Sequence, residues 1–169
     1  PRMATGEVRG AFSMSEPGCG SDVAAIKTKA VKGGDGNYAI TGQKMWLTNG
    51  GSANLVAVLV RTDLGESDSP YKNMSTFLID KESGFGETAQ GVTVPGKIEK
   101  MGYKGVESTE LVYDGYKCPA ENILGGEEAG LNKGFGQMMD ALEVGRVNVA
   151  ARGVGIAQRA LELALRYSQ

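Results

Sequence analysis

The sequence contains no histidine, and this absence removes several classes of chemistry at once. Without an imidazole, the chain cannot carry Ser-His or Cys-His nucleophilic machinery or a histidine-ligated metal. Its two cysteines, Cys19 and Cys118, lie far apart and have no cysteine neighbours, so a cysteine-ligated zinc site is not predicted either. We expect both thiols to stay reduced and to behave as small buried hydrophobes.

Long apolar runs and concentrated charge are absent as well. No run approaches the roughly 20 apolar residues that a membrane-spanning helix needs, and the start of the chain lacks the apolar core of a signal peptide. The net charge is −2 with scattered Lys and Arg, which predicts no basic face for nucleic acid. A 41% apolar share with 22% charged residues is globular, and we expect neither a membrane nor a nucleic-acid partner.

Glycine, in contrast, is abundant: 26 of 169 residues, about double the usual share, clustered between strand-like segments. The apolar run 54–61 predicts a central strand, the segment 33–37 a hairpin turn, and the polar segment 62–73 a loop. Many short strands without helices between them predict a β-barrel or sandwich. The expected strands are 7–14, 26–32, 38–41, 44–48, 54–61, 75–80, 92–96 and 108–118.

The character of the sequence changes at about residue 120. From Asn132 onward there is no proline, and apolar residues recur at steps of three and four, which predicts one long helix or two joined end to end. Such a helix cannot bury its own apolar stripe. We therefore expect the chain to be an internal fragment whose helix finds its partners downstream or in other subunits.

The segment "SEPGCGSD" (15–22) is too dense in turn formers for a strand or a helix. Glycines allow close backbone approach, and successive amide N–H groups can form an anion-binding nest. Such a nest suits a phosphate or pyrophosphate ligand, although the segment matches neither the dinucleotide-binding fingerprint nor the P-loop motif. A simple turn explains the same residues.

A second segment, "KMWLTNGG" (44–51), contains the only tryptophan, Trp46, and Thr48 two positions later. A period of two places both side chains on one face of a strand. An aromatic ring beside a hydroxyl suits a flat heteroaromatic ligand with a polar edge. The alternative is a buried core tryptophan beside an incidental threonine.

Together, "SMSEPGCGSD" and "GQKMWLTNG" resemble the acyl-CoA dehydrogenase family of flavoproteins. The resemblance continues through "VPGKIEKMGYKGVESTELVYDGYKCPAENILG" and "LEVGRVNVAARGVGIAQRALELALRYSQ", so it covers essentially the whole chain. One departure is Cys19, where the family has alanine or another small residue. Several motifs in the same order make the resemblance specific.

The resemblance implies a mainly β fold: a middle-domain β-barrel at 1–120, then a connector and the first long helix of a truncated helical-bundle domain at 121–169. It implies FAD as cofactor and an acyl-CoA as substrate. Met14 and Ser15 would border the flavin ring, 18–21 would run beside the pyrophosphate, and Thr48 would hydrogen-bond near the N5 atom. The implied cofactor-binding residues are Phe12, Met14, Ser15, Gly20, Ser21, Trp46, Leu47 and Thr48.

On the substrate side, the resemblance points to Ser21, Glu143 and Arg146. Both helix charges have a simpler interpretation, as solvated or ion-paired groups on a helix surface. Some family members carry the catalytic glutamate immediately before this arginine, but here that position is Gly145, which has no side chain to accept a proton. We therefore expect no catalytic base and no metal ligand within the 169 residues. Glu16 and Asp22 are expected to be loop and turn anchors.

The implied reaction is α,β-dehydrogenation of a saturated acyl-CoA to a trans-2-enoyl-CoA, with electrons passed to an electron-transfer flavoprotein. The implied assembly is a homotetramer, or a dimer, of the full-length protein. Two alternatives stay open: a flavin oxidase of the same fold, acting on acyl-CoA or nitroalkanes, and a non-catalytic relative. We expect the bacterial cytoplasm as the compartment, with the mitochondrial matrix as second choice.

Overall fold

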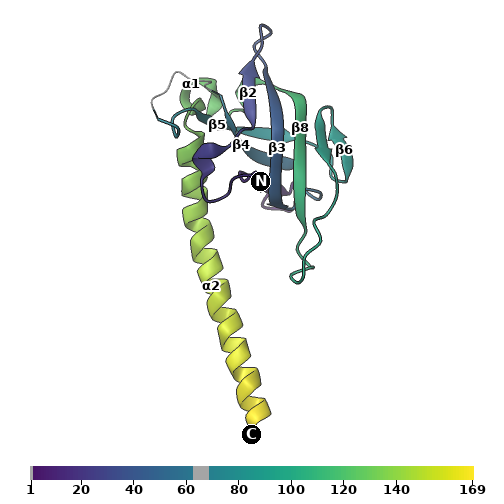
Figure 1. Ribbon diagram of the computed structural model, residues 1–169, viewed down its shortest axis with the longest axis vertical. Coiled ribbons are helices and arrows are strands. Elements are labelled where there is room, and N and C mark those ends of the chain that lie inside the picture. Colours follow the sequence, from purple (N-terminus) through teal and green to yellow (C-terminus); the bar gives the residue numbers. More distant parts are fainter. Residues whose placement is uncertain (1, 63–68) are drawn as a thin grey trace. The chain divides into compact units, whose positions relative to one another are not determined.

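The computed structural model of the protein describes residues 2–62 and 69–169. The chain forms two compact units, which are described separately: the β unit, Pro1–Phe135, and the helical unit, Gly136–Gln169. Figure 1 shows the strands of the β unit in purple to green and the helical unit in yellow-green. The expected order, a mainly β region followed by a long helix, is confirmed.

One sheet organises the β unit, with strand order β1-β4-β2-β3-β8-β7-β6 and β5 paired to β4. The β3–β8 and β4–β5 pairs are antiparallel and long, whereas β1 runs parallel to β4. The strands are β1 (Gly10–Ser13), β2 (Lys29–Lys32), β3 (Tyr38–Thr48), β4 (Leu55–Arg61), β5 (Met74–Asp80), β6 (Gly86–Ala89), β7 (Val92–Val94) and β8 (Ser108–Cys118).

The expected strand 108–118 matches β8, and the others match to within a few residues, with two exceptions. The segments 38–41 and 44–48 form one continuous strand, β3. Strand β6 was not predicted, since its residues Gly-Glu-Thr-Ala have little strand propensity, and it is held by pairing with β7. Most of the expected loop at 62–73 lies outside the described residues.

The core lies where the apolar run predicted a central strand. Val56, Val58 and Val60 of β4 are fully buried, and β4 is flanked by β5 on one edge and by β1 and β2 on the other. Phe77 of β5 meets Tyr38 of β3 edge-on, with ring centroids 5.1 Å apart. This contact ties the two long antiparallel strand pairs, β3–β8 and β4–β5, together.

Strand β3 is continuous because one glycine allows a neighbouring segment to cross closely. Gly42 has a φ of +148°, and a Cβ there would lie 2.5 Å from the Thr28 hydroxyl oxygen. Further along, the register of β3 against β8 skips Trp46, so that one extra residue bulges out between Met45 and Leu47. Trp46 takes a φ of 69°, which is uncommon for a bulky side chain.

The connector "GEEAG" (126–130) has regular secondary structure, and most of its residues are exposed or half-exposed. It forms the short helix α1 (Gly126–Gly130). Two 3-10 turns lie elsewhere in the β unit, at Val23–Ala25 and Ala120–Asn122. Glu127 accepts hydrogen bonds at 2.6 Å from both the Lys32 ammonium and the Tyr38 hydroxyl. The connector is thereby fixed to strands β2 and β3.

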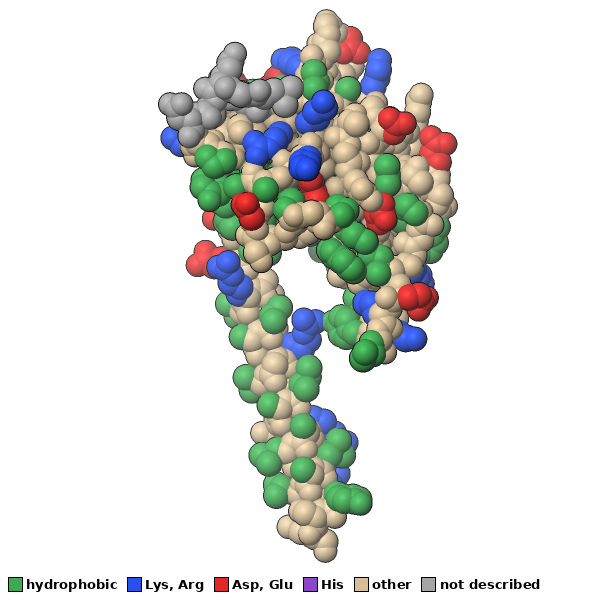
Figure 2. Space-filling model, in the orientation of Figure 1, with side chains coloured by type: hydrophobic (Ala, Val, Ile, Leu, Met, Phe, Trp, Pro, Cys, Tyr) green, Lys and Arg blue, Asp and Glu red, His purple; other side chains and the backbone are tan. Residues whose placement is uncertain are grey.

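The long helix α2 (Gly134–Ser168) is a single unbroken helix, which resolves the alternative left open by the sequence. Within the helical unit many large apolar side chains are exposed, and Figure 2 shows them in green along the helix. None of the described helices is long and apolar enough to cross a membrane. The expected domain boundary at 120/121 stays a prediction.

We predict that Gly50→Ala destabilises the β unit. A Cβ at Gly50 would lie 1.9 Å from the Thr109 hydroxyl oxygen, inside the core, so the strand ends must separate. We expect the free energy of unfolding to fall by about 1–3 kcal/mol, measured by urea denaturation. Gly34→Ala is the control, because nothing lies within 4 Å of its Cβ position. Equal stability of the two variants would contradict the prediction.

Candidate functional site

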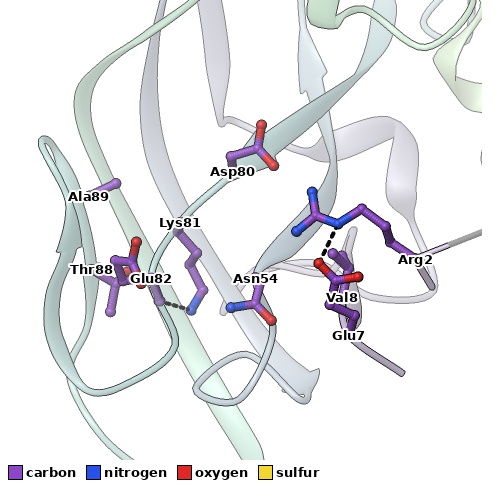
Figure 3. A pocket seen from close by; sticks show the side chains of 9 residues that line it. All are labelled: Arg2, Glu7, Val8, Asn54, Asp80, Lys81, Glu82, Thr88 and Ala89. Atoms are coloured by element: carbon purple, nitrogen blue, oxygen red, sulfur yellow. Dashed lines mark hydrogen bonds and ion pairs between the residues drawn. The ribbon is translucent and has the colours of Figure 1, made fainter. Parts of the chain in front are cut away.

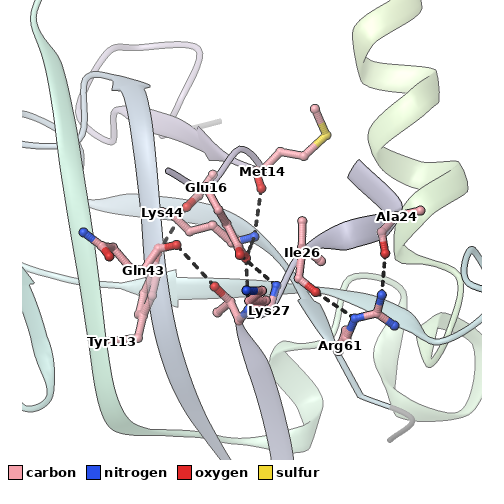
Figure 4. A network of polar contacts seen from close by, with 11 residues as sticks. Met14, Glu16, Ala24, Ile26, Lys27, Gln43, Lys44, Arg61 and Tyr113 are labelled. Carbon is pink, nitrogen blue, oxygen red and sulfur yellow. Dashed lines mark hydrogen bonds and ion pairs between the residues drawn. The ribbon is translucent and has the colours of Figure 1, made fainter. Parts of the chain in front are cut away.

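The structure brings the two sequence motifs side by side. The loop that follows β1 runs along β3, and the Met45 amide donates to the Ser15 carbonyl at 3.0 Å. Figure 4 shows Met14 and Glu16 of the loop close to Lys44 of β3. Residues about 30 positions apart in the sequence are thus held side by side.

A buried ion pair holds this junction. Lys44 is 0% exposed, and its ammonium donates to the Glu16 carboxylate at 3.0 Å and to the Met14 carbonyl at 2.8 Å. The Glu16 carboxylate also accepts from the amides of Lys27 at 2.7 Å and Thr28 at 3.0 Å. The pair therefore fastens three segments of the chain together, which confirms Glu16 as a loop anchor.

The pKa values of this pair reflect opposing causes. Burial raises the pKa of Glu16, but the Lys44 charge and the amides of Lys27 and Thr28 outweigh it and hold that pKa below its ordinary value. Burial lowers the pKa of Lys44, and the Glu16 carboxylate opposes that shift. Glu16 is therefore ionised at neutral pH, where its carboxylate accepts hydrogen bonds and is poorly suited to transferring protons.

The loop itself is a tight turn closed by two hydrogen bonds, from Glu16 N to Cys19 O at 2.9 Å and from Cys19 N to Glu16 O at 3.1 Å. Nothing in the described chain lies within 4 Å of a Cβ at Gly18 or Gly20, and neither has a positive φ. The fold of the described chain therefore does not require glycine at either position, and the backbone is open to a ligand. The Asp22 side chain does not cap the following 3-10 turn, contrary to expectation.

At the end of β3 the bulge determines which side chains face the core and which face outward. Trp46 is 58% exposed and Thr48 is also exposed, so the core interpretation of the tryptophan is wrong. Leu47 is 2% exposed and its carbonyl accepts from the Thr109 hydroxyl at 3.1 Å. Its side chain lies in the core, so Leu47 contributes to a surface site at most through its backbone.

The exposed groups have donors to offer. In the described part of the chain, the hydroxyls of Ser15, Ser21 and Thr48 make no hydrogen bond. Phe12 is 36% exposed, and Met14, which precedes Ser15, is half-buried. An exposed indole, uncommitted hydroxyls and an open glycine turn fit a flat heteroaromatic ring attached to a phosphate chain, which is the composition of FAD.

A second anchor, Glu107, was missed by the sequence analysis. Its carboxylate accepts from the amides of Gly51 and Ser52 at 3.1 and 2.9 Å and from the Ser52 hydroxyl at 2.9 Å, which fixes the turn after Thr48. Lys44 was missed too, although it lies in phase with buried Tyr38 and Ile40. That alternation was the signal that its ammonium would point inward.

The helical unit carries the remaining candidates. Glu143 and Arg146 are exposed on α2, three residues apart, with Gly145 beside the arginine. The described residues contain no ion pair between them. Their placement relative to the β unit, and thus their role as substrate contacts, stays a prediction.

A hollow of about 470 Å³ lies in a different part of the β unit, and none of the predicted site residues lines it. Figure 3 shows its mixed charges, including the Arg2–Glu7 ion pair at 2.8 Å and buried Lys81. The Lys81 ammonium donates to the carbonyls of Glu82 at 2.9 Å and Gly51 at 3.5 Å. No group of three or more metal-ligating side chains occurs among the described residues.

Comparison with known proteins places the chain in a family. The family models "Acyl-CoA dehydrogenase, middle domain" and "Acyl-CoA dehydrogenase, C-terminal domain" match residues 11–116 and 132–169. The (2S)-methylsuccinyl-CoA dehydrogenase of Cereibacter sphaeroides is 38% identical over 100% of this chain and 30% of its own length. Mitochondrial isovaleryl-CoA dehydrogenase of Oryza sativa subsp. japonica is 40% identical over 99% of this chain and 37% of its own.

Solved structures give the same assignment. Butyryl-CoA dehydrogenase from Megasphaera elsdenii matches with a TM-score of 0.87 and 34% identity, over 99% of this chain and 40% of its own. A chain of the electron transferring flavoprotein structure from Acidaminococcus fermentans matches at 0.84 and 32%, over 98% and 40%. A glutaryl-CoA dehydrogenase from Mycobacterium smegmatis, solved in complex with FADH2, matches at 0.60 and 31%, over 73% and 28%.

The chain spans only 30% and 37% of the lengths of the two curated relatives, and the matches cover both of its units. The motifs that suggested the family lie where the structure places the exposed indole, the open turn and the buried ion pair. The chain therefore belongs to the acyl-CoA dehydrogenase family of flavoprotein oxidoreductases.

Proposed function

We propose that the protein containing this chain is an FAD-dependent acyl-CoA dehydrogenase that converts a saturated acyl-CoA to a trans-2-enoyl-CoA. The observation that carries the proposal is the pairing of exposed Trp46 and Thr48 with the Ser15 loop through the Met45–Ser15 hydrogen bond. This arrangement presents an aromatic face and hydroxyl donors together. Relatives named as dehydrogenases of five different acyl-CoA esters support the reaction class and leave the substrate open.

Bound FAD would supply the acceptor for the substrate's β-hydrogen as hydride. Trp46 would pack against the ring, Thr48 would donate to the ring edge, and Ser15 would donate through its hydroxyl or amide. The open turn at Gly18–Gly20 would leave room for the pyrophosphate, and Ser21 would contact the substrate as well. Phe12 and Met14 would complete the apolar border of the ring site.

The residues present also limit what the chain contributes to proton transfer. A base must reach the substrate's α-carbon, and Gly145 offers no acceptor at the helix position where some family members carry one. We infer that the base lies outside residues 1–169. Glu143 and Arg146 would then recognise polar parts of the thioester rather than move protons, since the rigid guanidinium fork suits such recognition.

We also propose partners for the full-length protein. An electron-transfer flavoprotein would reoxidise the reduced protein, in line with the match to a chain of the Acidaminococcus fermentans electron transferring flavoprotein structure. The exposed apolar residues of the helical unit would be covered in a homotetramer or dimer of the full-length protein, in the bacterial cytoplasm.

Our first functional prediction concerns the reductive half-reaction. In an anaerobic titration of the full-length protein with saturated acyl-CoAs of graded length, one range of lengths should bleach the flavin absorbance and yield the 2-enoyl-CoA. Flavin that is bound but not bleached by any acyl-CoA would contradict the proposal. Bleaching followed by rapid reaction with oxygen would instead indicate an oxidase.

The second prediction concerns Thr48. Thr48→Val keeps the shape of the side chain and removes the hydroxyl, so flavin reduction by the best acyl-CoA should slow by about tenfold through loss of one hydrogen bond. Thr48→Ser should restore most of the rate. Thr93→Val on β7, outside the site, is the matched control and should leave the rate unchanged. Stopped-flow absorbance measures all three, and an unchanged rate in Thr48→Val would refute the role.

A further inference from the structure

The buried ion pair has a feature that a purely stabilising role does not explain. Lys44 is 0% exposed and Glu16 is 7% exposed, and removing two charges from water is costly. A buried pair is often replaceable by apolar side chains without loss of stability, so its presence is weak support for a role in stability. The position of the Lys44 charge therefore needs a reason other than stability.

The ammonium of Lys44 is aimed at one particular peptide group. Besides Glu16, its partner is the carbonyl of Met14 at 2.8 Å, which faces Lys44 in the interior (Figure 4). The Met14–Ser15 bond is not cis. In a trans peptide the carbonyl and the following N–H point in opposite directions, so the Ser15 N–H points away from Lys44.

That N–H makes no hydrogen bond within the described part of the chain, whereas the Ser15 carbonyl is held by Met45 at 3.0 Å. Lys44 thus holds the Met14–Ser15 peptide through its carbonyl, and Met45 holds the next peptide through the Ser15 carbonyl. The free Ser15 N–H lies in the loop residue that pairs with Met45, whose neighbour on β3 is exposed Trp46. A donor whose own carbonyl is hydrogen-bonded to a cation is polarised and becomes a stronger donor.

We propose that Lys44 is a positioning residue, which orients and polarises the Met14–Ser15 peptide so that the Ser15 N–H donates to an electron-rich edge of the bound flavin ring. The proposal rests on the proposed function. Glu16 neutralises the buried ammonium and ties the loop to Lys27 and Thr28, which keeps the Met14 carbonyl in place. Because negative charge develops on the ring when it is reduced, the polarised donor stabilises the reduced form.

The test uses the full-length protein with Lys44→Met combined with Glu16→Gln. This double variant removes both charges, so no unpaired ion stays buried. Lys32→Met combined with Glu127→Gln is the matched control: this pair also joins opposite charges, at 2.6 Å, but it ties β2 to α1 beside Tyr38, at the opposite end of β3 from Thr48. If the double variant does not fold, Lys44→Gln with Glu16→Gln keeps a neutral donor in the same space.

Three quantities are measured: amide hydrogen exchange of the 14–19 segment in the apoprotein, the FAD dissociation constant, and the midpoint potential of the flavin. We expect faster exchange in the double variant, about tenfold weaker FAD binding from loss of a charge-assisted hydrogen bond, and a more negative potential. The Gln–Gln variant should fall between. The Lys32→Met, Glu127→Gln control should leave all three quantities unchanged.

The outcomes separate this inference from the function on which it rests. If the unaltered protein binds no FAD, the proposed function fails and the flavin role of Lys44 fails with it. If the unaltered protein binds FAD but the neutral variants keep its affinity and potential, only the positioning role is overturned. An equal change in the Lys32→Met, Glu127→Gln control, or failure of both neutral Lys44 pairs to fold, would show a structural role and would also overturn it.

Discussion

The arrangement of the candidate site depends on the buried ion pair between Lys44 and Glu16. The loop after β1 has no regular secondary structure, and its own hydrogen bonds close the turn from Glu16 to Cys19 without attaching that turn to the sheet. The pair and the Met45–Ser15 hydrogen bond attach that loop to β3, the longest strand of the sheet together with β8. The rigidity of the sheet is thereby passed to a segment whose own composition favours mobility.

The same logic recurs at the other end of the site. Glu107 fixes the turn after Thr48 with three hydrogen bonds from Gly51 and Ser52. The candidate ligand-facing residues therefore lie between two carboxylate anchors, each of which binds backbone amides. Burial raises the pKa of Glu107, but its bonds to Ser52 and Gly51 outweigh burial and hold it below the ordinary value. Both anchors stay ionised at neutral pH, so the site geometry does not depend on proton uptake there.

Much of the fold could be predicted because strand signals are local. The apolar run 54–61 and the expected strand 108–118 match β4 and β8 nearly residue by residue, and the proline-free pattern of apolar residues predicted α2. Strand β6 could not be predicted, because its stability comes from pairing with β7 rather than from its own residues. The Lys44–Glu16 contact spans 28 positions, and a single sequence does not reveal which charges meet across such a separation. The roles of Ser21, Glu143 and Arg146 depend on groups beyond a single unit, so they stay predictions.

The bulge at Trp46 has a consequence for how this strand tolerates changes in length. Without the extra residue, strict alternation from Lys44 would place position 46 inward and position 47 outward, yet Leu47 is in the core and Trp46 is exposed. The bulge thus acts as a one-residue phase shift that lets a buried lysine and a buried leucine share a strand three positions apart. Deleting a residue here would remove this bulge from the β3–β8 ladder and cost the protein its exposed ring, so the bulge is itself part of the site.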